Sequence, residues 1–344
     1  MREMLQTLIC QVCQAARMAG RRGRSILVGM FCLALFSGGP LWAGELGHFA
    51  PGVLNIRDFL VPDPGFYYIQ YFVWYNADTF RDRNGDKVKS INAGPITLDV
   101  DFEVDSVVLA PALVWVSPWK ILGARYGAQI VPTFGNTTFQ SAFRTETGFG
   151  EDTDESQFGV GDLYVKPVWL GWDGAHYSAA AGYGFYAPVG KYNNGDATNI
   201  GLGFWTHEFQ LATAWYPWEE RGTAVTLTGT YEIHSEYEDV NITPGDRFSL
   251  NWGISQYLPL NDANSLILEV GAMGYSQWQV EKDSGSDVNK DFIPKDQVHA
   301  AGGQIGLLYA PWNAFVQFHG LQEFGAQARF EGQFFTWTVG KKFF

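Results

Sequence analysis

Four acidic residues alternate with apolar residues between positions 98 and 105. They are Asp99, Asp101, Glu103 and Asp105. Side chains two residues apart lie on the same face of a β-strand, so this segment would carry a ladder of four carboxylates. Such an acidic ladder can favour cations or bind a polar group beside a permeation path. The alternative is a solvated face of a strand that extends into external loops, and the pattern favours both equally.

Three further groups of polar side chains have a spacing that places each group on one strand face. They are Asp162 with Lys166, Glu232 with His234 and Glu236, and Gln317 with His319 and Glu323. One histidine between two flexible acids is a weak set of metal ligands, so no metal site is predicted. We expect ion pairs and hydrogen-bond networks that line an interior instead.

Motifs of common hydrolases are absent from the sequence. No G-x-S-x-G or H-E-x-x-H segment occurs, and the last cysteine is Cys32. The sequence therefore predicts no catalytic residues, no enzyme and no cofactor.

The first 43 residues have the layout of a cleaved secretory signal peptide. Arg21, Arg22 and Arg24 precede an apolar run at 26–36, and the Gly-Gly-Pro segment at 38–40 breaks that run before the small residue Ala43. The apolar run is too short to span a bilayer, which needs about 20 residues. We predict Sec-type export with cleavage near Ala43. Translation could begin at Met1 or at Met18.

Composition limits the class of protein that remains after this leader. The leader holds five basic residues and one acid, which leaves 18 basic and 35 acidic residues and a net charge near −17. Nucleic acid is excluded as a partner, because phosphate binding needs a basic surface. Aromatic residues make up 16% of the chain, yet they are dispersed rather than clustered. Dispersal by alternation is what a transmembrane β-barrel requires.

The rest of the chain reads as about twelve strands separated by turns. We predict them at 66–77, 99–116, 121–134, 157–170, 175–187, 199–216, 222–236, 246–259, 265–280, 297–310, 313–323 and 329–343. Short connections alternate with longer, acidic ones such as 135–156. This indicates an all-β fold, a transmembrane antiparallel β-barrel with short periplasmic turns and longer acidic external loops. The predicted domains are the leader 1–43, a periplasmic or lumen-inserted segment 44–65 and the barrel 66–344.

Tryptophan recurs in the short turns, three times directly after proline. These residues, Trp119, Trp172, Trp218 and Trp312, are predicted to form a girdle at the periplasmic membrane interface. A soluble β-sandwich whose turns happen to carry Pro-Trp is the alternative. The chain ends with Phe343 and Phe344, and a terminal strand that finishes in phenylalanine is typical of the signal read by the barrel assembly machinery.

Alternation predicts which side chains line the lumen. In the first strand we assign Gln70, Phe72 and Trp74 to the lumen and the alternating tyrosines to lipid. In the ninth strand Glu269 opposes an apolar face and is assigned to the lumen. The predicted lumen set also contains the acidic ladder and the polar groups at 162–166, 232–234 and 317–323.

Several segments together resemble a known family. They are 48–52 (HFAPG), 62–67 (PDPGFY), 161–172, 230–246 and 323–326 (EFGA). In order along the chain, they are similar to the meta-pathway phenol-degradation-type outer-membrane proteins. The resemblance implies a transporter of aromatic or other hydrophobic compounds and names no catalytic residue.

The expectation is a protein of the outer membrane of a Gram-negative bacterium that passes small hydrophobic or aromatic solutes passively. Its partners would be outer-membrane lipid, the solute and, during biogenesis, the barrel assembly machinery. The alternatives are a structural or adhesive barrel and a membrane-embedded lipid hydrolase.

Overall fold

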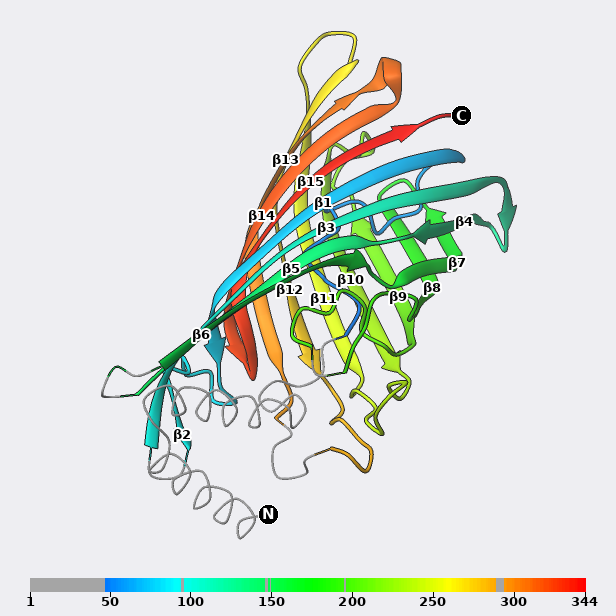
Figure 1. Ribbon diagram of the computed structural model, residues 1–344. Helices are drawn as coiled ribbons and strands as arrows, with labels where there is room; N and C mark the ends of the chain where they lie inside the picture. Colours follow the sequence, from blue (N-terminus) through cyan, green and yellow to red (C-terminus); the bar gives the residue numbers. More distant parts are fainter. Residues whose placement is uncertain (1–46, 94–95, 146–147, 149, 195, 289–293) are drawn as a thin grey trace, which may run out of the picture. The chain divides into compact units, whose positions relative to one another are not determined.

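The computed structural model describes residues 47–93, 96–145, 148, 150–194, 196–288 and 294–344. The predicted leader lies outside this part of the chain. The strands form one sheet that closes on itself, because β1 (Gly65–Arg81) pairs with both β15 (Arg329–Lys342) and β3 (Ile96–Ile121). Figure 1 shows β1 between these two strands. Closure leaves no open edge inside lipid, where water cannot satisfy backbone groups.

The other strands follow in chain order around the ring. They are β4 (Ala124–Val131), β5 (Phe134–Thr145), β6 (Gly150–Val160), β7 (Leu163–Asp173), β8 (Tyr177–Ala187), β9 (Thr206–Trp215), β10 (Thr223–His234), β11 (Arg247–Pro259), β12 (Leu266–Gln279), β13 (Gln297–Tyr309) and β14 (Ala314–Gln327). Two smaller elements stand outside the ring: β2 (Ser90–Ala93) pairs with β3, and the 3₁₀ turn η1 (Ala310–Trp312) joins β13 to β14.

Two positions of the ring are each built from two consecutive strands. Both β4 and β5 pair with β3, while β6 pairs with β5 and β7 pairs with β4. The break at 132–133 contains Pro132, which cannot donate a ladder hydrogen bond. Counted this way, the described residues form a twelve-stranded antiparallel barrel, and the predicted fold class is confirmed. No helix among these residues is long and apolar enough to cross a membrane.

Two predicted connections are wrong in detail. The predicted turn at 117–120 lies within β3, and the chain reverses at Leu122 and Gly123, whose φ angles are 51° and 78°. Glycine tolerates such angles without strain. The predicted external loop at 135–156 is instead the β5–β6 hairpin, whose polar strand residues look like a loop in sequence.

The hairpin belongs to an extension of the wall that we call the blade, formed by the first half of β3 with β5 and β6. At about 3.3 Å per residue, the 26 residues of β3 measure roughly 85 Å, whereas about ten residues cross a bilayer. In Figure 1 β6 lies toward the end of the barrel opposite the one that carries the C-terminus. Short turns and the C-terminus mark the periplasmic end, so the blade lies at the external end.

Candidate functional site

Residues 47–64, which we call the strap, run through the interior of the barrel before β1 begins. The backbone N–H of Phe49 donates to Glu232 Oε1 on β10 (2.8 Å). The backbone N–H of Ile56 donates to Gln304 Oε1 on β13 (3.0 Å). Both acceptors are buried side chains on the inner face of their strands, so the strap occupies the lumen.

Arg57 anchors the strap near the periplasmic end. Its Nε donates to Ser255 Oγ (2.8 Å), and its two terminal nitrogens donate to the carbonyls of Arg221 (3.1 Å) and Gly222 (2.8 Å). The fully buried carboxylate of Glu269 lies 3.3 Å from Arg57 Nε. A buried carboxylate needs such a partner, because burial without one is costly.

A tight turn at residues 55–58, in the middle of the strap, is hydrogen-bonded to side chains of the surrounding strands. Asp58 Oδ2 accepts hydrogen bonds from the backbone N–H of Asn55 (3.1 Å), its Nδ2 (2.7 Å) and the Tyr71 hydroxyl (2.9 Å). The His319 ring nitrogens lie 3.1 Å from Asn55 Oδ1 and 2.8 Å from the Gly52 carbonyl. Burial raises the pKa of Asp58, and the hydrogen bonds from Tyr71 and Asn55 oppose this shift.

His48 fixes the external end of the strap. Its Nε2 lies 2.8 Å from Asp162 Oδ2, and its Nδ1 lies 2.6 Å from Thr206 Oγ1. Asp162 also accepts the backbone N–H groups of Gly190 (2.8 Å) and Leu202 (2.7 Å), so it joins the strap to the loop between β8 and β9. Burial lowers the pKa of His48, and the hydrogen bond to Asp162 acts against that shift.

One side of the lumen, which we call the polar wall, consists of the inner faces of β9 to β14. Its largest buried polar side chains are Glu208, Glu232, Arg247, Glu269, His319 and Glu323. These groups are arranged in local networks. Lys166 Nζ on β7 lies 3.6 Å from Glu208, and Arg247 forms an ion pair with Asp296 in which both side chains are fully buried.

Glu323 is the centre of a second network on this wall. It accepts hydrogen bonds from the hydroxyls of Tyr75 (3.0 Å) and Tyr275 (2.7 Å) and from the backbone N–H of Gly332 (2.7 Å). Arg329 lies 4.0 Å away. Burial of this carboxylate is compensated by three donors and a nearby cation.

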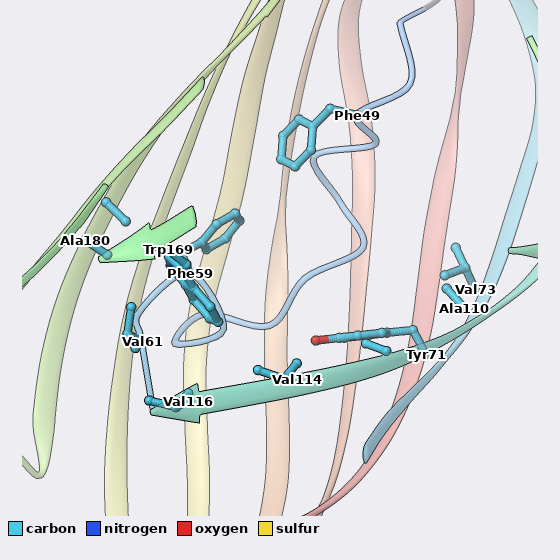
Figure 2. Packing of buried hydrophobic residues seen from close by; sticks show 12 residues of the cluster. Phe49, Phe59, Val61, Tyr71, Val73, Ala110, Val114, Val116, Trp169 and Ala180 are labelled. Atoms are coloured by element: carbon cyan, nitrogen blue, oxygen red, sulfur yellow. The ribbon is translucent and has the colours of Figure 1, made fainter. Parts of the chain in front are cut away.

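The opposite side of the lumen, the apolar wall, consists of the inner faces of β1, β3 and β5 with Phe330 and Phe334 of β15. Here the strap contributes Phe49, Phe59 and Val61 to one hydrophobic cluster. The wall contributes side chains that include Tyr71, Val73, Ala110, Val114 and Val116, together with Trp169 from β7. Figure 2 shows Phe59 packed beside Trp169 and Tyr71 pointing into the lumen.

The structure places one part of the predicted lumen set inside the barrel. These buried side chains are Asp162, Lys166, Glu232, His234, Glu269, Gln317, His319 and Glu323. Several of them hold the strap or a buried partner. Their role along a solute path stays a prediction.

The assignment of faces in β1 was wrong. Phe72 and Trp74 are 41% and 36% exposed and lie with Gln70 on the outer face, whereas Tyr71 and Val73 are buried inside. Aromatic side chains occupy both faces of this strand, so alternation alone does not identify the lumen. The deciding chemistry is the tyrosine hydroxyl, which needs a buried acceptor such as Asp58.

The placement of the acidic ladder beside a permeation path was also wrong. Asp99, Asp101 and Glu103 are exposed and share the outer face of β3 with Val107 and Leu109. The fourth member, Asp105, is half-buried on that same face and accepts a hydrogen bond from Trp74 Nε1 (2.7 Å). The reason is the length of β3, which carries these carboxylates on the blade, beyond the lipid. The alternative interpretation, a solvated strand face, fits the structure.

The predicted girdle and assembly residues lie at the periplasmic end. Trp119, Trp218 and Trp312 are 60–69% exposed, and Trp172 Nε1 donates to the Leu122 carbonyl (3.3 Å). The terminal Phe343 and Phe344 are exposed beside Phe66, to whose backbone both are hydrogen-bonded. Their membrane and assembly roles remain predictions.

Sequence reasoning missed some of the residues that fix the strap or form the buried ion pairs, namely Glu208, Arg57 and Asp296. Glu208 could have been assigned to the lumen from the sequence, because Glu208 and Gln210 alternate with apolar residues along β9. Arg57 and Asp296 have no such pattern, because both lie outside strands and act through partners far away in the sequence.

Comparisons with known proteins agree with this architecture. Residues 77–339 match the family model described as "Putative MetA-pathway of phenol degradation". The COG4313 outer membrane channel from Pseudomonas putida F1 is 16% identical and has a TM-score of 0.56, with 84% of this chain and 100% of that chain covered. The β domain of the Bordetella autotransporter BrkA is 12% identical with a TM-score of 0.43, over 82% of this chain and 100% of that one. No curated protein matches the sequence.

Proposed function

Because the chain belongs to this phenol-degradation family, whose matched region covers most of its strands, we propose that it is an outer-membrane channel for passive uptake of small hydrophobic or aromatic compounds. The single observation that carries the proposal is the apolar wall. Barrel interiors are usually polar. Here one side of the lumen instead packs Tyr71, Val114 and Trp169 against Phe59 of the strap.

The proposed mechanism is partition followed by diffusion. A neutral apolar solute loses its water at the external end and exchanges it for contacts with buried apolar side chains, which is favourable. The strap excludes a continuous column of water, so hydrated ions pass poorly. Buried carboxylates such as Glu323 oppose anions. No step requires a cofactor or an energy source.

Location and partners belong to the same proposal. We infer export by the Sec route into a Gram-negative periplasm, cleavage near Ala43, and insertion by the barrel assembly machinery that reads Phe343 and Phe344. The outer face of the barrel would then contact outer-membrane lipid.

The test combines conductance and uptake. The refolded protein in a planar bilayer should conduct small ions weakly, and naphthalene should reduce that conductance, whereas benzoate should not. Intact Gram-negative cells that express the protein should accumulate naphthalene faster than cells with an empty vector. A folded, heat-modifiable barrel that changes neither readout would contradict the proposal and favour a structural or adhesive barrel.

A hydrolase is less well supported. His48 with Asp162 and Thr206 has the residue types of a catalytic triad, but Thr206 is fully buried and its hydroxyl is shared with His234 (2.8 Å). A nucleophile needs access to its substrate, and this hydroxyl has none.

A further inference from the structure

Five phenylalanines meet on the inner face of the barrel at its external end, and we call them the phenyl cluster. They are Phe80 of β1, Phe102 of β3, Phe139 and Phe143 of β5, and Phe330 of β15. The ring centroids of Phe80 and Phe330 are 5.1 Å apart, and those of Phe102 lie 5.9 Å from Phe143 and 6.2 Å from Phe139. Four strands therefore present one aromatic surface at the external end.

The chemistry of this surface selects a neutral planar ligand. Phenyl rings pair with other rings edge to face or offset-stacked. Within the described part of the chain, no lysine or arginine stacks on Phe80, Phe102, Phe139 or Phe330.

The phenyl cluster continues into the lumen along β1 and β15. Tyr75 and Phe334 come next, with ring centroids 4.6 Å apart, and Phe334 reaches the strap at Gly52, where an added Cβ would lie 3.2 Å from the ring. Beyond Gly52, the apolar side chains of the strap, including Phe59 and Val61, pack on the apolar wall as far as the periplasmic end.

The two sides of the strap differ in what a passing solute would displace. A solute that passed between the strap and the polar wall would break hydrogen bonds of His48, Ile56 and Arg57, and an apolar solute cannot replace them. Toward the apolar wall, the solute mainly exchanges van der Waals contacts for equivalent ones, and the polar contacts that it disturbs include the hydrogen bond from the Tyr71 hydroxyl to Asp58. The apolar side is the path of smaller cost.

We propose that a small planar apolar solute binds first on the phenyl cluster and then moves between the strap and the apolar wall, while the strap stays bound to the polar wall. This inference rests on the proposed function and adds to it the entry site and the route.

The first experiment measures naphthalene accumulation by intact cells, because a simple phospholipid vesicle lets naphthalene cross unaided. The double variant Phe102→Ala/Phe139→Ala should reduce the protein-dependent rate at least fivefold, about 1 kcal/mol. The matched control is Phe158→Ala, which removes a phenyl ring from the outer face of β6, where it is 69% exposed. That control should retain the normal rate.

The outcomes separate the route from the function. If the unmodified protein does not accelerate uptake, the proposed function fails. If it does and the double variant keeps the normal rate, the entry site is wrong. Heat-modifiable mobility checks folding, and Phe102→Leu/Phe139→Leu, which keeps apolar volume without rings, replaces the alanine variant if that variant is unfolded.

The second experiment tests the route with two disulfide tethers, for which residues 33–344 supply no competing thiol. Ile56→Cys/Gly253→Cys fixes the strap to β11 of the polar wall, where an added Cβ at Gly253 would lie 2.8 Å from Ile56 Cγ2. Gly52→Cys/Phe334→Cys fixes it to the apolar wall. Each variant is compared oxidised and reduced, so each is its own control.

The oxidised polar-wall tether should leave uptake equal to its reduced form. The oxidised apolar-wall tether should lower uptake at least fivefold. Loss of uptake with the polar-wall tether, or equal rates with the apolar-wall tether, would overturn the route.

Discussion

The two walls of the lumen hold the same strap by different forces. The polar wall binds it mainly through hydrogen bonds and the Arg57–Glu269 pair, with Ile56 packed in a small apolar cluster. The apolar wall contacts it mainly through side chains of the cluster around Phe59, together with the hydrogen bond from Tyr71 to Asp58. Leaving a buried polar group without its partner costs about 1–3 kcal/mol. An apolar contact can be exchanged for a solute at little cost. The difference indicates a plug that is fixed on one side and displaceable on the other.

Removing the strap should have the largest effect, because it leaves both walls without their common partner. Deletion of residues 44–64 should raise single-channel conductance on the order of tenfold, since a barrel of this size is otherwise filled from within. Preference for neutral aromatic solutes should fall. An unchanged conductance in a correctly folded barrel would show that the strap does not limit the pore.

Separate substitutions on the two sides of the strap test the asymmetry directly. Arg57→Ala leaves the Glu269 carboxylate buried without its cation, at a cost of about 3 kcal/mol, and should give openings like those of the strap deletion. Phe59→Ala also costs about 3 kcal/mol but only widens the apolar side. It should leave ion conductance near normal and raise naphthalene uptake. Similar conductance changes in both variants would contradict the asymmetry.

Much of the barrel was predictable from the sequence because its rules are local. Alternation and turn residues placed most strands from 175 onward, for example β10 and β11, within a few residues, whereas the strand predicted at 199–216 begins only at Thr206. The short turns and the twelve-strand count follow from the same pattern. By contrast, the β5–β6 hairpin has polar residues on both faces, since it leaves the lipid, so its strands looked like a loop.

The interior was less predictable because it depends on long-range partners. Glu232 and His319 were assigned to the lumen from alternation alone, and they lie there. The strap has no periodic pattern of apolar and polar residues. Nothing in its sequence therefore showed that Phe49 would contact β10 or that Arg57 would contact β12. The prediction of the lumen and lipid faces of β1 was wrong for a related reason, because only the hydrogen-bond partner of the Tyr71 hydroxyl distinguishes the two faces.

A smaller effect is expected from pH at the external end of the strap. Besides Asp162 and Thr206, the groups near His48 are Glu232, His234 and Tyr186. Burial lowers the pKa of His48, so docking disfavours its charged form. The docked state therefore keeps its full stability above the ordinary histidine pKa of about 6.5 and loses it as pH falls through the lower docked value.

Openings should accordingly become more frequent when the pH of the bilayer experiment is lowered from about 7.5 to 5.5. The variant His48→Gln keeps a hydrogen-bonding side chain but cannot become charged, so its opening frequency should not change over that range. The raised pKa of Asp58 acts in the opposite direction, because its protonated form favours docking at lower pH. An equal response in the unmodified protein and the His48→Gln variant would assign the pH effect to another group.

The acidic ladder should give the smallest effect, and it tests whether charge acts only from inside the lumen. Replacing Asp99, Asp101, Glu103 and Asp105 with Asn or Gln should leave the reversal potential in a salt gradient unchanged, because these side chains lie on the outer face of the blade. At 0.15 M salt, exposed charges more than about 8 Å away are largely screened. The matched variant Glu323→Gln removes one lumen carboxylate and should reduce cation preference. A shift produced by the ladder variant and not by Glu323→Gln would mean that ions pass along the blade rather than past the polar wall.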